Sequence, residues 1–201
     1  MLARIRAGRK KPGTGAAGRG LDVARGTRAA LSARMKNDTT NALELLMAQH
    51  EEVDALIEEI EDTEGPSEKA RLFEALADKL AAHATIEEKL FYPAMMHETT
   101  RELLVESTEE HLSVKRLLAD MMEIEPDDEH FAAKLTVLKE QVRHHAHDEE
   151  EDQLFPQVRE LFDEDELAAL GNEMLAMFEQ LLEKGDPRRS VPTETRVAAP
   201  L

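Results

Sequence analysis

The chain has 201 residues, a formal net charge of −18 and no cysteine, which excludes thiolate metal sites, iron–sulfur clusters, disulfides and thiol catalysis. Aromatic residues make up 3% and charged residues 34%, which is typical of amphipathic helices with an aliphatic core. No apolar run reaches the length of a membrane span, and the basic amino end lacks the hydrophobic segment of a signal peptide. The sequence therefore predicts a cytoplasmic protein without a transmembrane segment.

The charge is divided unevenly along the chain. Residues 1–38 contain ten Lys and Arg against Asp22 and Asp38, whereas residues 39–184 have a charge balance of −27. The basic segment is rich in Gly and lacks apolar periodicity, which predicts a disordered tail with weak helical character only at 21–36. The acidic body should repel nucleic acid, so any contact with a polyanion would have to come from this tail.

Apolar residues at a helical period of about 3.6 predict five helices after the tail. Asn41 with Glu44, and Asp163 with Glu166, have the spacing of helix caps, and Pro93 is expected to kink or end the second helix. The predicted helices cover approximately 41–64, 67–92, 100–122, 126–156 and 163–184. We therefore expect a basic tail (1–38), a bundle (39–160), an accessory helix (161–184) and a second disordered tail (185–201).

The first two predicted helices resemble the third and fourth. When His50 is aligned with His111, apolar residues coincide 3, 7 and 10 positions later. When His83 is aligned with His145, they coincide 10, 7 and 3 positions earlier, and Glu87 falls on Glu149. This internal repeat predicts an all-α fold: an antiparallel up-down four-helix bundle of two hairpin repeats, with the fifth helix added.

Each of these four helices carries a histidine on its buried face: His50, His83, His111 and one near residue 145. Burying four imidazoles costs desolvation, which metal coordination offsets. Glu87 lies four residues after His83 and so on the same face, with no Lys or Arg on its own stripe of the helix. Two such carboxylates facing each other can bridge two cations. Because thiolates are missing and an oxygen-only cage does not fit, the pattern favours two iron ions over manganese or zinc.

The fourth helix has two possible registers. Its upstream apolar residues place His145 and Glu149 toward the core, whereas its downstream residues place His147 and Glu151 there. The two segments differ in phase by one residue, which a π-bulge would accommodate. We favour His145 with Glu149 as metal ligands and keep His147 with Glu151 as the alternative.

The motifs around these residues resemble the hemerythrin-like HHE cation-binding domain over roughly residues 40–160. They are LLMAQHEEVDALIEEIE, HATIEEKLFYPAM, EEHLSVKRLLADM and VRHHAHDEEEDQLFP, in the order H…H-x-x-x-E…H…H-x-x-x-E. The resemblance implies an up-down bundle with a non-heme di-iron centre that binds oxygen or related small oxidants.

The chain departs from the oxygen-carrying members of that family in two places. Those carry H-x-x-x-H on the third helix, where this chain has His111 and Lys115, and they end in an aspartate where it has a glutamate. We therefore expect binding or sensing of oxygen, peroxide or nitric oxide, or iron handling, rather than reversible oxygen carriage or a dedicated enzyme.

Two other functions remain as alternatives. One is a di-iron peroxidase or oxidase on the same site, and the other is a metal-free interaction bundle. A ferritin-like enzyme is disfavoured, because no histidine lies three residues after a glutamate.

Overall fold

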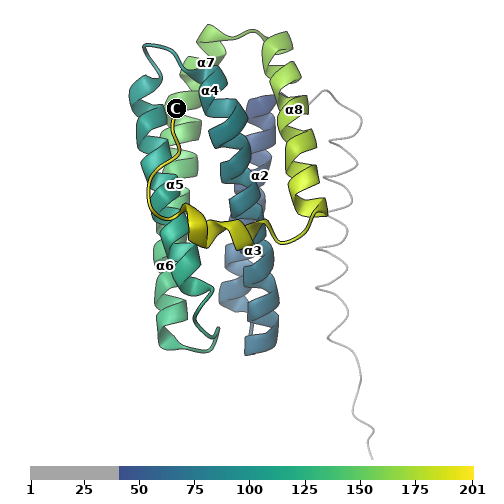
Figure 1. The fold of residues 1–201 in the computed structure, drawn as a ribbon, viewed down its shortest axis with the longest axis vertical. Coiled ribbons are helices and arrows are strands. Elements are labelled where there is room, and N and C mark those ends of the chain that lie inside the picture. The colour runs from purple at the N-terminus through teal and green to yellow at the C-terminus, as the bar shows by residue number, and fades with distance from the viewer. Residues whose placement is uncertain (1–40) are drawn as a thin grey trace, which may run out of the picture. The chain divides into compact units, whose positions relative to one another are not determined.

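The structure is a computed structural model that describes residues 41–201, and every regular element in that range is helical (Figure 1). The all-helical prediction is confirmed for this part of the chain. The tail predicted at 1–38, with its weak helix at 21–36, lies outside the described residues. No helix in the described range is both long and apolar enough to cross a membrane.

The long helices run side by side along the long axis of the molecule, with α8 against α2 and α3 (Figure 1). Two sets of segments, α3-η1-α4 and α6-η2-α7, each follow one another without a break. The elements are α2 (Ala42–Asp62), α3 (Pro66–Ile86), the π-helix η1 (Glu87–Phe91), α4 (Tyr92–Met95), α5 (Arg101–Met121), α6 (Glu129–Arg143), the π-helix η2 (His144–Leu154), α7 (Phe155–Leu161), α8 (Glu164–Glu183) and the 3-10 helix η3 (Pro187–Glu194).

Two helices, α2 and α8, begin at the N-terminal caps that the sequence predicted. The Asn41 side chain accepts a hydrogen bond from the backbone N–H of Glu44 at 3.0 Å, which caps α2. Asp163 and Glu166 form a reciprocal capping box at the start of α8. Both caps satisfy N–H groups that have no partner inside the helix, so both predictions are confirmed.

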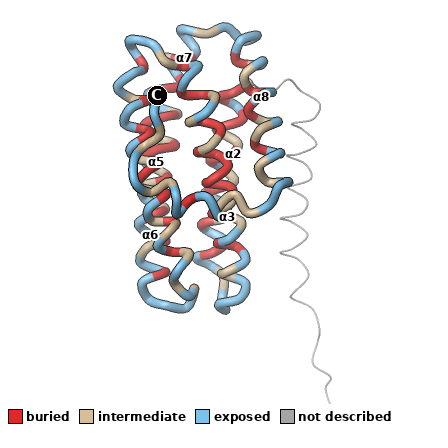
Figure 2. Tube along the Cα trace, in the orientation of Figure 1, coloured by how far each residue is buried: buried red, intermediate tan, exposed pale blue. Residues whose placement is uncertain are grey.

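An aliphatic core joins the two helix pairs. Ile57, Leu76, Leu118 and Leu138 come from α2, α3, α5 and α6, are at most 1% exposed and belong to one cluster. Figure 2 shows such buried positions along the inner faces of the helices. Each side chain of this kind contributes about 1.5–3 kcal/mol on burial. This packing holds the four helices at fixed positions, so side chains on their inner faces meet reproducibly.

The prolines after both π-helices do not end the helices that contain them. Pro93 was expected to kink or end its helix; α4 passes through Pro93 and ends two residues later at Met95, and α7 passes through Pro156 to Leu161. Each proline stands near the start of the α-helix that follows a π-helix. A proline is tolerated in a first turn, where its missing N–H is not needed for the α-helical hydrogen-bond ladder.

The segment 185–201 was predicted to be disordered, but the structure packs η3 across α3 and α5 (Figure 1). Val191 is 1% exposed, and the backbone N–H of Arg188 donates to Asp78 at 3.0 Å. Arg116 donates to the backbone carbonyl of Thr195 at 2.9 Å. These partners are far away in sequence, so the local composition, which is rich in proline and polar residues, did not reveal them.

Candidate metal centre

Four buried histidines, His50, His83, His111 and His145, come from α2, α3, α5 and η2 and are each 4–6% exposed. Every Nδ1 has an acceptor: Glu151 for His50 (2.7 Å), Gln49 for His83 (2.7 Å), Glu88 for His111 (3.1 Å) and Glu110 for His145 (2.8 Å). A neutral ring that donates from Nδ1 keeps its lone pair on Nε2. In their neutral form, the four rings would thus carry the proton on Nδ1 and leave Nε2 free to bind metal.

Two fully buried carboxylates lie among the four Nε2 atoms. Glu87 Oε2 is 3.1 Å from His83 Nε2 and 3.2 Å from His111 Nε2. Glu150 Oε2 is 3.3 Å from His50 Nε2 and 3.8 Å from His145 Nε2. Each carboxylate therefore contacts one histidine from each half of the repeat, which is the arrangement of two bridging ligands.

Several of these buried atoms have no hydrogen-bond partner among the described residues. They are both oxygens of Glu87, Oε2 of Glu150 and Nε2 of His50. A buried carboxylate without partners costs several kcal/mol unless a positive charge compensates it. The donor atoms form two overlapping groups within which all distances are at most 4.8 Å: His50, His83, Glu87 and Glu150, and Glu87, His111 and His145. Imidazole nitrogens mixed with carboxylate oxygens suit borderline divalent cations, so the residues present fit a pair of such ions.

The protonation behaviour of the centre points the same way. Burial opposes charging of His50 and His111, yet contacts with neighbouring carboxylates outweigh it and raise the pKa of both to about 9. Burial also opposes ionisation of Glu87, but His83 and His111 hold the pKa of Glu87 well below its usual range. The surroundings of His50, His111 and Glu87 thus favour positive charge, either as protons or as bound cations, whereas burial lowers the pKa of His83.

The structure brings together five of the six residues that we favoured as ligands: His50, His83, Glu87, His111 and His145. The sixth, Glu149, is buried, but its ligand atoms lie with Glu110 and His144. Glu150 takes the place predicted for Glu149.

The reason lies in the winding of η2, an eleven-residue π-helix. Each turn of a π-helix closes with an i→i+5 hydrogen bond, so the residue five positions after His145 shares its face. That residue is Glu150. The one-residue phase difference between the upstream and downstream apolar residues is therefore accommodated by the wide turns of η2.

The alternative pair also lies outside the two donor groups. His147 is about one-third exposed and contacts Asp54 at 3.0 Å and Glu151 at 3.1 Å. Glu151 instead holds Nδ1 of His50. Glu151 thus supports the ring of His50 from outside the centre, and His147 contacts Glu151.

A signal for Glu150 was present in the sequence. His83 precedes Pro93 by ten residues, whereas His145 precedes Pro156 by eleven. Alignment of the two prolines, instead of the two histidines, places Glu150 opposite Glu87, each six residues before its proline.

Sequence reasoning also missed Tyr92, which is fully buried in α4. Its hydroxyl donates to Glu150 Oε1 at 3.0 Å and lies 3.3 Å from His111 Nε2. Burial and the negative charges of Glu150 and Glu87 raise the pKa of Tyr92 well above its usual value. The phenol therefore keeps its proton beside the centre.

A small cavity adjoins the four histidines. Its volume is about 30 Å³, and its other walls are largely aliphatic, formed by residues such as Val53, Leu80, Leu118 and Val142. A space of this size holds one water-sized molecule or little more. The donor groups thus border a small and mostly apolar chamber.

Lys115, which stands where the oxygen carriers have a histidine, also lines this cavity. Its Nζ is 2.8 Å from Glu88 and 2.9 Å from Glu194, a residue of η3. Two carboxylates therefore pair with its charge, and Glu88 in turn holds Nδ1 of His111. Lys115 connects the C-terminal segment to the centre without entering either donor group.

Comparison with known proteins agrees with this geometry. The hemerythrin HHE cation binding domain family matches residues 41–158. The fold is similar to the crystal structure of a hemerythrin HHE cation binding domain-containing protein from Mycobacterium kansasii, with 27% identity and a TM-score of 0.65. That alignment covers 78% of this chain and 95% of the other. No curated protein matches the chain significantly. The matched region covers more than half of the chain and includes all the residues of the centre, so the chain belongs to the hemerythrin HHE cation-binding domain family.

Proposed function

We propose that this chain is a non-heme di-iron protein that binds or senses oxygen, peroxide or nitric oxide, or that takes part in iron handling. Its scaffold is the antiparallel up-down bundle of two hairpin repeats, with α8 as the fifth helix. The metal ligands are His50, His83, Glu87, His111, His145 and Glu150, the last in place of Glu149.

One observation carries the proposal: four Nε2 atoms converge on two fully buried carboxylates, and both oxygens of Glu87 and Oε2 of Glu150 lack a hydrogen-bond partner among the described residues. An ordinary buried histidine has both ring nitrogens satisfied by protein groups, which is not the case for His50. Glu87 and Glu150 each contact two histidines, one from each half-repeat. Two ions that share these carboxylates explain this arrangement better than one ion.

Iron is favoured over the other metals by its ligand preferences and by the predicted chemistry. Zinc in structural sites takes four protein ligands, often thiolates, and manganese prefers mostly oxygen ligands. Two carboxylates that each contact two histidines inside a helical bundle offer a mixed nitrogen and oxygen donor set, which suits a pair of iron ions. Zinc and manganese remain the alternatives.

The cavity and Lys115 favour a small ligand. A chamber of about 30 Å³ suits a ligand of very few atoms, and the absence of a fifth histidine ligand leaves coordination positions open beside it. The aliphatic walls suit apolar diatomics such as oxygen and nitric oxide. A binding or sensing role follows more directly from this site than turnover of a larger substrate.

Tyr92 supports a second candidate, a di-iron peroxidase or oxidase on the same site. When bound, iron supplies electrons to a reducible small oxidant. The Tyr92 hydroxyl keeps its proton and lies within 3.3 Å of His111, so this chain has a proton donor next to the centre. An enzyme that reduces peroxide needs such a donor, whereas a simple binding site does not.

Anaerobic reconstitution with ferrous iron tests the proposal. After desalting, elemental analysis should give about two irons per chain, and spectra should change on addition of oxygen, peroxide or nitric oxide. One iron or none would contradict the di-iron proposal.

Turnover of peroxide separates the two candidates. Tyr92→Phe should retain iron and lose most peroxide turnover if Tyr92 supplies the proton. The binding function is favoured instead if neither the original chain nor the variant turns over peroxide.

A further inference from the structure

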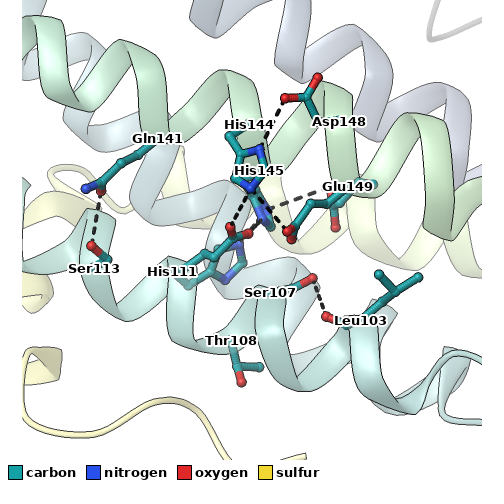
Figure 3. Close-up of polar contacts among 12 residues, drawn as sticks. Leu103, Ser107, Thr108, His111, Ser113, Gln141, His144, His145, Asp148 and Glu149 are labelled. Carbon is teal, nitrogen blue, oxygen red and sulfur yellow. Dashed lines mark hydrogen bonds and ion pairs between the residues drawn. The ribbon is translucent and has the colours of Figure 1, made fainter.

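A third group of potential ligands lies outside the centre at the start of η2. Glu110, His144 and Glu149 each offer an atom within 4.8 Å of the others, and we call them the outer cluster. His144 Nε2 is 3.3 Å from Glu149 Oε1 and 3.7 Å from Glu110 Oε1. Figure 3 shows His144 and Glu149 turned toward each other beside His145. None of these three residues belongs to the two donor groups of the centre.

Glu149 provides an independent sign that this cluster takes a cation. It is 6% exposed, and its Oε2 is buried without a hydrogen-bond partner among the described residues. An acidic group on a solvated surface would be satisfied by water, but this oxygen is shielded from it. A buried carboxylate oxygen without a partner needs compensation by a positive charge.

The surroundings of the outer cluster provide no such charge from lysine or arginine. Among the described residues, the ion pairs of Glu110 and Glu149 are made with histidines alone, His144 and His145. Two carboxylates and an imidazole form a donor set that suits a borderline divalent cation. The side chain of His144 is 55% exposed, so solvent reaches the cluster from outside.

We propose that Glu110, His144 and Glu149 bind a third divalent cation, of the ferrous or zinc type, in exchange with solvent. Glu110 connects this site to the centre, because its Oε2 accepts a hydrogen bond from His145 Nδ1 at 2.8 Å while its Oε1 faces His144. The outer site is therefore one carboxylate away from a ligand of the centre. It depends on the geometry of these three residues and not on which metal occupies the centre.

Equilibrium dialysis of the full-length, iron-loaded chain against Zn²⁺ tests the proposal, with iron and zinc measured in the same sample. The chain should bind one further equivalent of zinc and retain its iron. His144→Ala and Glu149→Gln should each weaken this binding about tenfold or more, because each removes one of three ligands. His144 is exposed, so its substitution should leave the fold intact, which circular dichroism checks.

His130→Ala is the matched control, since it removes an exposed histidine at the start of α6 and should leave zinc binding unchanged. The proposal is overturned if the unmodified chain takes up no additional zinc, or if His144→Ala binds as much zinc as the unmodified chain. Failure of the di-iron proposal appears separately, as a low iron value. Even then, one equivalent less zinc in His144→Ala than in the unmodified chain would still identify the outer site.

Discussion

The two halves of the repeat deliver the same kind of carboxylate to the centre by different helical windings. In the first half, His83 and Glu87 are four residues apart, and the five-residue η1 follows. In the second half, His145 and Glu150 are five residues apart within the eleven-residue η2. The second half has one more residue between its histidine and its proline, and the wide turns absorb it. The two halves therefore share the position of the carboxylate relative to the histidine in space, but not the number of residues between them.

The halves also differ in what covers them. In the first half, α8 packs against α2, α3 and η1. In the second half, η3 packs against α5, and His144 at the start of η2 is about half exposed. The second half is the one that carries the outer cluster.

Substitution of the two neighbouring glutamates of η2 gives the largest expected difference. Glu150→Gln should reduce iron to about one per chain or less, because it removes a carboxylate that contacts both histidine pairs. Glu149→Gln is the matched control and should retain about two irons after desalting. Elemental analysis after reconstitution measures both. The reverse result would show that η2 in solution follows the α-helical register.

The histidines of η2 provide a second and smaller contrast. His145→Ala should remove about one iron per chain, since His145 Nε2 belongs to only one donor group. His147→Ala should change iron content little, because His147 contacts Asp54 and Glu151 outside the centre. Loss of both irons in His147→Ala, with His145→Ala unaffected, would refute the proposed ligand set.

Removal of metal should destabilise the two halves unequally. With free iron at about 100 times its Kd, binding contributes roughly 3 kcal/mol, so chelation should lower Tm by roughly 5–10 °C. Hydrogen exchange should accelerate more in η2 than in η1, because the longer π-helix has more turns of poor geometry. An unchanged Tm after confirmed metal loss would mean that the centre does not support the fold.

Deletion of Asp148 should have the smallest effect and tests the comparison most directly. Asp148 is exposed, and without it Glu150 would follow His145 by four residues, as Glu87 follows His83. We expect iron to be retained and the free energy of unfolding to change by about 1 kcal/mol or less, since only an extra residue is removed. Iron content and denaturant unfolding measure the outcome. Loss of iron would show that the centre requires the five-residue spacing in this half.

Much of this protein follows from local patterns in the sequence. The helical period, the caps at Asn41 and Asp163 and the family resemblance are all confirmed. The histidine on the inner face of each helix was also predictable, because residues three, four and seven apart share a face over a regular α-helix. These features depend on interactions within one helix, which the amino-acid order determines by itself.

Only the tertiary structure placed Glu150, instead of Glu149 or Glu151, among the four histidines, and only it revealed Tyr92 and the packing of η3 against α3 and α5. The extra residue between His145 and Pro156 can be absorbed anywhere along that stretch, and the local apolar period does not say where. The packing of neighbouring helices determines where the extra residue is accommodated. It holds both His145 and Leu154 toward the core, which requires wide turns between them. The physical reason is that a helix can change its winding at small cost, whereas a packed core cannot change the place where four helices meet.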